Sequence, residues 1–151
     1  MSWTGRLAEL GIPLPPVAPP AGVYLPAVRT GSLVFTAGQV PLVDGTVVAT
    51  GKVGAGIGAE TARQLARICA LNALAAIDAL VGLDSVTRVV KVVGFVASAP
   101  GFTGQPGVVN GASDLLGEVF GEAGAHARSA VGVAELPLGA PVEVELVVEV
   151  A

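Results

Sequence analysis

HARSAVGVAELPLGAPVEVELVVEV, residues 126–150, has the alternating pattern of two β-strands joined by a short turn. With a period of two, Arg128, Ala130 and Gly132 share one face of the first strand. Beside such small neighbours, an arginine has open volume in front of its guanidinium, which suits the binding of a small carboxylate. We therefore predict that Arg128 anchors a ligand.

The second strand of this stretch, residues 141–150, alternates between apolar and mainly acidic side chains. We expect the apolar set to face the helices and Glu143, Glu145 and Glu149 to face the other side of the sheet. In this interpretation Arg128 shares that second face with the acids. Two roles for Arg128 stay open on chemical grounds: an ion pair with Glu143 or Glu145, or a guanidinium available to a ligand.

The rest of the pattern predicts an α+β domain with two long helices. They are expected at residues 58–81, ended by Gly82, and at residues 107–120. Shorter elements are a helix at 2–10, an extended proline-rich segment at 13–20, strands at 24–28 and 33–36, and a hairpin of 39–43 and 46–50 around Asp44-Gly45.

The strand expected at residues 85–98 is apolar on both sides. Strict alternation places one set of its side chains on each face: Val86, Val90, Val92 and Val96, and opposite them Val89, Val93 and Phe95. Two helices can cover only one face of a sheet. We therefore expect a second copy of the chain to cover the other face, with ligand clefts between subunits.

The composition supports self-association. Hydrophobic residues make up 52% of the 151 residues and charged residues only 13%, about half the usual share of roughly 25%.

The most apolar long window, residues 65–83, contains Arg67 and Asp78, so we expect no membrane-spanning helix. A net charge of −4 with scattered basic residues disfavours a nucleic-acid partner. A single cysteine, Cys69, and the lack of a signal peptide favour the cytoplasm.

Other motifs carry less weight. Residues 54–59 spell GxGxxA, but no strand runs into them and the expected element order is not that of a dinucleotide-binding fold. His126 and Ser129 point to opposite faces of a strand, which disfavours a serine hydrolase. A single histidine makes a histidine-rich metal site impossible, and Cys69 on an apolar helix stripe reads as a core residue.

Several segments together resemble the YjgF/RidA family. They are Tyr24, VFTAGQVP (34–41), Asn110 and ARSAVGVAELPLGAPVEVE (127–145), in combination with the helix order. The resemblance covers residues 23–151, as a single domain. It leaves residues 1–22 outside as an N-terminal arm, so the chain is similar to a subgroup with a proline-rich extension.

The resemblance implies a chorismate mutase-like α+β fold, with a mostly antiparallel six-stranded sheet, two helices on one face, and assembly into a homotrimeric barrel. It implies a hydrolase similar to 2-iminobutanoate/2-iminopropanoate deaminases, which convert 2-imino or enamino acids into 2-keto acids and ammonia without metal or cofactor. The roles implied for the site are these: Arg128 binds the substrate carboxylate, Glu143 positions water, Tyr24 and Gly38 line the cleft, Asn110 lies near it, and the Ala130 carbonyl contacts water.

Two positions depart from the family pattern. Many members have cysteine in place of Ala130 and glutamate in place of Gly132, which predicts a roomier and less polar pocket here. Burial would raise the pKa of Glu143, whereas Arg128 nearby would lower it. Two alternatives stay open: a non-catalytic trimer that binds small carboxylates, and an endoribonuclease, which family naming suggests and the acidic charge disfavours.

Overall fold

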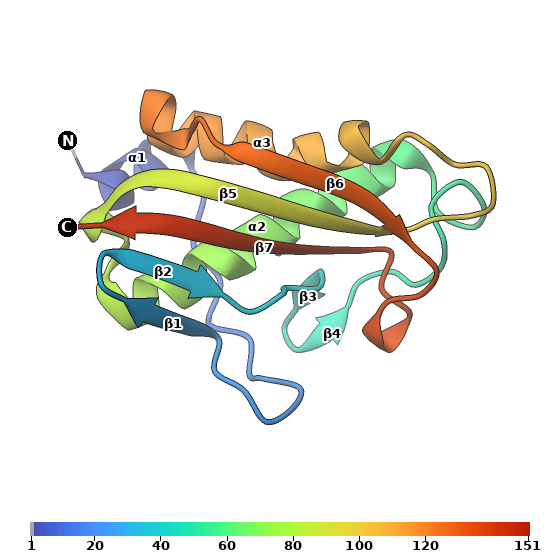
Figure 1. The fold of residues 1–151 in the computed structure, drawn as a ribbon, viewed down its shortest axis with the longest axis horizontal. Coiled ribbons are helices and arrows are strands. Elements are labelled where there is room, and N and C mark those ends of the chain that lie inside the picture. The colour runs from blue at the N-terminus through green and yellow to red at the C-terminus, as the bar shows by residue number, and fades with distance from the viewer. Residues whose placement is uncertain (1) are drawn as a thin grey trace.

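A computed structural model describes residues 2–151, which form a five-stranded sheet in the order β1-β2-β7-β5-β6 (Figure 1). The strands are β1 (Ala27–Thr30), β2 (Leu33–Thr36), β5 (Val86–Ala97), β6 (Ala127–Val133) and β7 (Val142–Val150). Neighbouring strands are antiparallel except β5 and β6, which run parallel. The expected mostly antiparallel α+β architecture is confirmed.

The sheet has five strands rather than the expected six. The hairpin around Asp44-Gly45 forms a separate two-stranded sheet of β3 (Leu42–Val43) and β4 (Thr46–Val47). Gln39 still pairs with Val144 as an isolated bridge, but Pro41 follows and has no N–H to donate. The Leu42 N–H then bonds to the Val40 carbonyl, which turns the chain out of the sheet.

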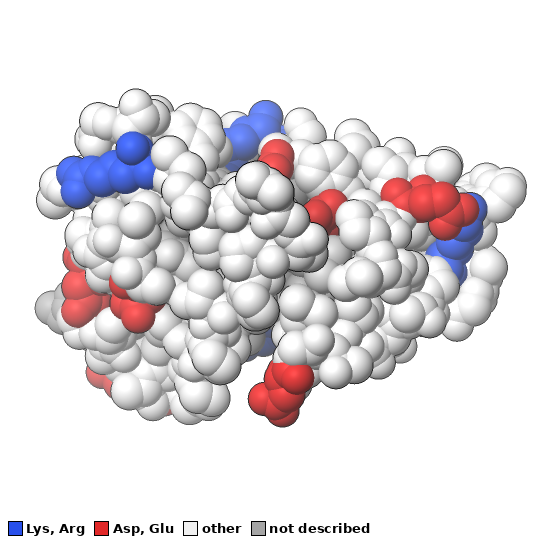
Figure 2. Space-filling model, turned by 90° about the horizontal axis from the view of Figure 1, so that it is seen from below, with Lys and Arg blue, Asp and Glu red and all other residues white. Residues whose placement is uncertain are grey.

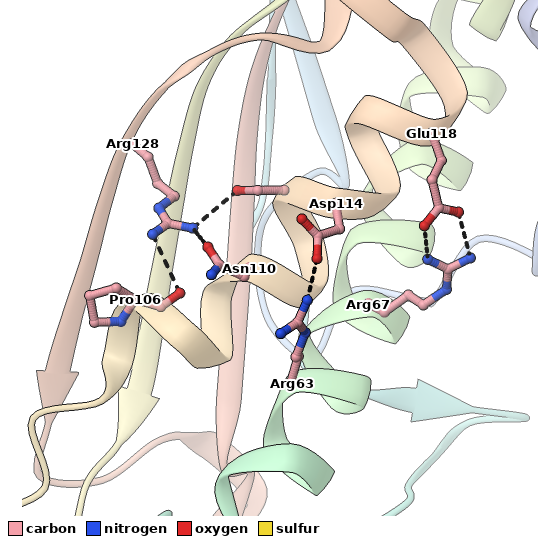
Figure 3. Close-up of polar contacts among 8 residues, drawn as sticks. Arg63, Arg67, Pro106, Asn110, Asp114, Glu118 and Arg128 are labelled. Carbon is pink, nitrogen blue, oxygen red and sulfur yellow. Dashed lines mark hydrogen bonds and ion pairs between the residues drawn. The ribbon is translucent and has the colours of Figure 1, made fainter.

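Helices α2 (Ala59–Val81) and α3 (Gln105–Phe120) cover one face of the sheet (Figure 1). They approach closely because Gly111 has no side chain: a Cβ there would overlap the Arg63 carbonyl. The pairs Arg63–Asp114 and Arg67–Glu118 link the helices at the surface (Figure 3). Exposed pairs of this kind contribute at most about 1 kcal/mol each, so the packing of small residues is the main link between these helices.

By length and composition, α2 is apolar enough to cross a membrane. Over half of its apolar window is buried inside the protein, however, and its buried residues include Leu65, Cys69 and Ile77. It is the central core helix, packed against β7 and α3.

The faces of β5 differ from strict alternation. Register shifts occur between Val86 and Arg88 and between Val89 and Lys91, where β5 pairs with β7. Each bulge inserts a residue and reverses the alternation. Val89 therefore lies with Val92 in the core, and Val90 turns to the other side, so the prediction was wrong for these two residues.

The N-terminal helix, α1 (Trp3–Leu10), packs on the domain. The Ser2 hydroxyl caps its start, and Gly11, with φ 69°, ends it as expected. The Trp3 indole donates to the Val86 carbonyl at 2.7 Å and its ring meets Phe120 edge to face at 5.1 Å. Leu7 of this helix is buried. The arm is thus held to the core at its first helix.

The face of the sheet opposite the helices is open and partly apolar. Val28, Phe35 and Val131 on this face are 49%, 43% and 43% exposed. Figure 2 shows the molecule from below, the side on which β1 lies in Figure 1; this side is also mostly uncharged, with charged side chains in small separate groups. An exposed apolar sheet face is typical of a surface that another subunit covers.

Candidate functional site

Arg128 projects from β6 toward α3, on the helix side of the sheet (Figure 3). Its backbone pairs with Val92, which is buried in the core beneath the helices. The guanidinium Nη1 donates to Asn110 Oδ1 at 2.7 Å and to Ser113 Oγ at 3.2 Å. Nη2 donates to the Pro106 carbonyl at 3.4 Å. Three residues of one helix face therefore hold the guanidinium.

The start of α3 explains this geometry. Pro106 stands in its first turn, where its missing N–H costs nothing, and its carbonyl accepts from Arg128 Nη2. Asn110 and Ser113 follow four and seven positions later, so all three lie on one side of the helix. Gly94 lets α3 approach the sheet, because a Cβ there would overlap Val109.

The space beside Gly132 is not empty. A Cβ at Gly132 would lie 2.8 Å from Gln105 Nε2 and 3.0 Å from Ser98 Oγ. The Gln105 amide fills this space and donates to Ser98 Oγ and to the Phe102 carbonyl. The prediction of a roomier, less polar pocket was therefore wrong at Gly132, since a side chain from another element occupies the volume.

Glu143 lies on the opposite face of the sheet from Arg128. It pairs with Phe95 in the register of β5 and β7 and points away from the helices. The expectation that Arg128 shares a face with the acids was wrong, and so was the alternative of an ion pair with Glu143 or Glu145. The reason is the register: Arg128 pairs with Val92, whose side chain faces the helices, whereas Glu143 pairs with Phe95 on the other face. In addition, β5 separates β6 from β7.

A cavity of about 430 Å³ opens beside Glu143. Its lining combines the end of the arm, the segment after β2 and the turn before β7: Ala21, Tyr24, Ala37, Gly38, Val40, Pro137, Leu138 and Glu143. Three residues expected at a site, Tyr24, Gly38 and Glu143, meet here. Leu138 forms an apolar wall and takes a left-handed backbone with φ 61°.

Gly38 and Tyr24 are placed by close contacts. A Cβ at Gly38 would lie 2.5 Å from Glu143 Oε1, so glycine is what lets the carboxyl lie over the β2–β3 connection. The Tyr24 hydroxyl accepts a hydrogen bond from the Ala21 N–H at 3.0 Å. The proline-rich arm thereby holds the tyrosine ring at the cavity.

Burial raises the pKa of Glu143, and the charge of Glu145 on the same strand raises that pKa further. Arg128 was expected to lower the pKa of Glu143. It does not contribute to the pKa shift, because it lies on the other face of the sheet. A carboxyl with a raised pKa at the wall of a cavity is suited to accepting and returning a proton.

The six residues expected at the site thus form two groups. Tyr24, Gly38 and Glu143 line the cavity, whereas Arg128 and Asn110 are bonded to each other on the helix side. Ala130 is half-buried beside the second group, two positions after Arg128 on β6. A single copy of the chain does not bring the two groups together.

Some polar residues near Arg128 were not expected. Ser113 Oγ lies 2.9 Å from His126 Nε2, so the partner of His126 is a helix serine and not Ser129. The spacing of Asn110 and Ser113 on one helix face was the signal available in the sequence.

Cys69 is fully buried as expected, and burial raises the pKa of its thiol. Within residues 2–151, no cluster of three His, Cys, Asp or Glu could hold a metal ion.

Comparisons with known proteins identify relatives over nearly the whole chain. Residues 4–150 match the family described as "YjgF/chorismate mutase-like, putative endoribonuclease". This match includes most of the arm. Protein TCP17 of Trypanosoma cruzi is 48% identical over 146 residues, which cover 95% of this chain and 91% of that protein.

Two solved structures show the same fold. The protein Atu1372 of Agrobacterium tumefaciens, of unknown function, is 43% identical with a TM-score of 0.89, over 99% of this chain and 94% of that one. Escherichia coli TdcF with bound serine is 26% identical with a TM-score of 0.65, over 91% of this chain and 94% of that one. A relative of this fold therefore binds a small amino acid.

Proposed function

The chain belongs to the YjgF/chorismate mutase-like family, and from this premise we propose that it hydrolyses reactive 2-imino and enamino acids to 2-keto acids and ammonia. The observation that carries the proposal is the state of Arg128. All three acceptors of its guanidinium are neutral oxygens. Within residues 2–151 it forms no ion pair. A fixed, uncompensated guanidinium is suited to a ligand carboxylate.

The second group of residues supplies the proton chemistry. An imine carbon is already electrophilic, so a bound water and one proton acceptor suffice for attack. Glu143 takes a proton from this water as oxygen bonds to C2 and returns that proton to the imine nitrogen, giving a carbinolamine. The carboxylate then takes the proton of the carbinolamine hydroxyl and passes it to the amino nitrogen as the C–N bond breaks, so that ammonia and the 2-keto acid leave and Glu143 is again ionised. No metal or cofactor is required for this sequence of steps.

We place this reaction between subunits of a homotrimer. Arg128 and Glu143 lie on opposite faces of one sheet, so one chain cannot present both to a single small substrate. The exposed apolar residues of the open face support contact with a second copy. In the assembly, Arg128 of one subunit faces Tyr24, Gly38 and Glu143 of the next, and the Ala130 carbonyl contacts water.

The test generates 2-aminoacrylate from serine with a PLP-dependent dehydratase and follows pyruvate release. We expect the protein to accelerate release. Arg128→Ala should reduce kcat/KM by about 100-fold, the loss expected for two charge-assisted hydrogen bonds of about 1.5 kcal/mol each. Arg67→Ala, on the outer surface of α2, is the matched control and should retain activity. Equal rates for wild type and Arg128→Ala would reject the proposal.

The serine bound in TdcF favours a second candidate, a non-catalytic trimer that binds small carboxylates. It predicts saturable, Arg128-dependent binding of pyruvate by calorimetry without faster imine hydrolysis. The "putative endoribonuclease" of the family description gives a third, weaker candidate. RNA cleavage by nuclease-free protein, retained in Arg128→Ala, would favour that function over both others.

A further inference from the structure

A continuous line of hydrogen bonds leads from a backbone carbonyl to the guanidinium of Arg128. The Gly124 carbonyl lies 2.6 Å from His126 Nδ1, and His126 Nε2 lies 2.9 Å from Ser113 Oγ. Ser113 Oγ in turn lies 3.2 Å from Arg128 Nη1. His126 and Ser113 are both half-buried at the junction of α3 and β6. None of the roles assigned above uses this pair.

The Gly124 carbonyl determines the state of the histidine ring. A carbonyl oxygen only accepts, so Nδ1 must carry a proton to bond with it. In the neutral ring, Nε2 then has a lone pair and accepts the Ser113 hydroxyl proton. This assignment satisfies both ring nitrogens and leaves the serine oxygen as an acceptor.

The serine oxygen completes the cradle of Arg128. Asn110 Oδ1 and Ser113 Oγ each accept from Nη1, which therefore has both of its hydrogens in use. Pro106 accepts from Nη2. Within the described residues, the Nε–H and the second Nη2 hydrogen have no partner. These are the donors that remain for the two oxygens of a carboxylate.

We propose that Ser113 and His126 are positioning residues for the carboxylate clamp. His126 orients the Ser113 hydroxyl so that its oxygen faces Arg128, and Ser113 fixes the guanidinium with its remaining donors directed at the substrate. The proposal rests on the function proposed above and deepens it. Without the serine acceptor, the guanidinium rotates more freely and must be ordered when the ligand binds, which weakens binding.

The first test compares Ser113→Ala with Ser129→Ala. Ser129 is the matched control, because it is half-buried one residue from Arg128 and its backbone pairs with Val93, away from the cradle. We expect Ser113→Ala to raise the Kd for pyruvate and the KM by about 5- to 20-fold, with kcat little changed. Ser129→Ala should change neither. Ser113→Thr keeps the hydroxyl and should restore most of the affinity.

The role of His126 is tested by replacing it with glutamine or asparagine, whose side-chain amides differ in length. Glutamine can place an oxygen acceptor near the position of Nε2, and asparagine can place a donor near the position of Nδ1. We expect His126→Gln to stay within about twofold of wild type and His126→Asn to match Ser113→Ala. Light scattering and circular dichroism on each variant verify assembly and fold.

A ligand-free readout separates this proposal from the enzymatic one. The ¹⁵N–¹H resonances of Arg128 should be protected in the wild type and exchange-broadened in Ser113→Ala. Broadening without any imine hydrolysis would support the positioning role and reject the enzymatic function. An unchanged Arg128 signal, with Ser113→Ala binding pyruvate as tightly as Ser129→Ala does, would overturn the positioning role.

Discussion

Arg128 and Glu143 lie on opposite faces of the same β-sheet. Arg128 is in register with Val92, and both side chains face the helices. Glu143 is in register with Phe95, and both side chains lie on the open face. Each residue has its own supporting group, a polar cradle on α3 for Arg128 and an apolar cavity for Glu143. A reaction that uses both residues needs two copies of the chain.

This separation predicts complementation between inactive variants. Arg128→Ala and Glu143→Gln should each retain at most about 1% of the wild-type activity alone. In trimers reassembled from an equal mixture, about one quarter of the clefts receive an intact arginine from one subunit and an intact glutamate from the next. We therefore expect about one quarter of the wild-type activity. A mixture that stays inactive, while light scattering and tag pull-down show mixed trimers, would contradict an intersubunit site.

Gly38→Ala should impair catalysis without unfolding the protein. The new Cβ would lie 2.5 Å from Glu143 Oε1, and the flexible carboxyl would move away from the cavity wall. Since general acid–base catalysis contributes about 10²- to 10⁴-fold, we expect kcat to fall by at least about tenfold. Thermal unfolding should change little. Normal kcat in this variant would show that the Glu143 position is not critical.

Glu143→Gln should stabilise the protein in a pH-dependent way. The folded-state pKa of Glu143 is raised, so the folded protein holds this proton more tightly than the unfolded chain does. Wild-type stability therefore rises as pH falls through the raised pKa toward the ordinary value of 4.5, and it decreases as pH increases. At about pH 8 the glutamine variant should have the higher Tm, and at about pH 4 the difference should disappear.

The control for this titration is Glu122→Gln, an exposed acid in the turn after α3. Its Tm difference from wild type should be small at both pH values. If the Tm difference of Glu143→Gln is equally small at both pH values, burial does not raise the pKa of the Glu143 carboxyl in the assembled protein.

The sequence predicted the elements well because their patterns are local. The apolar stripe of α2, the alternation of β7 and the glycine after α1 each depend on neighbouring residues, and each is confirmed. The faces of β5 were wrong in part because a bulge depends on pairing with a distant strand. Local alternation contains no signal for such an insertion.

The site was predictable as a list of residues but not as an arrangement. Alternation placed Arg128, Ala130 and Gly132 on one face of β6 correctly. Which face this is depends on the register of β6 beside β5, a contact between segments about 36 residues apart. The sequence also contained no local signal for the Ser113–His126 pair, because α3 supplies one residue and the segment just before β6 supplies the other.

Two glycines on α3 give opposite predictions for the same substitution. Alanine is the better helix former by about 1 kcal/mol, and at Gly117 a Cβ would contact nothing within 4 Å. Gly117→Ala should therefore stabilise the protein by about 0.5–1 kcal/mol in urea unfolding. At Gly111 the Cβ would overlap the Arg63 carbonyl, a backbone atom of α2 that moves only with its helix. Gly111→Ala should destabilise by about 1–3 kcal/mol. Equal effects at both positions would show that helix propensity, rather than the close approach of α2 and α3, governs this interface.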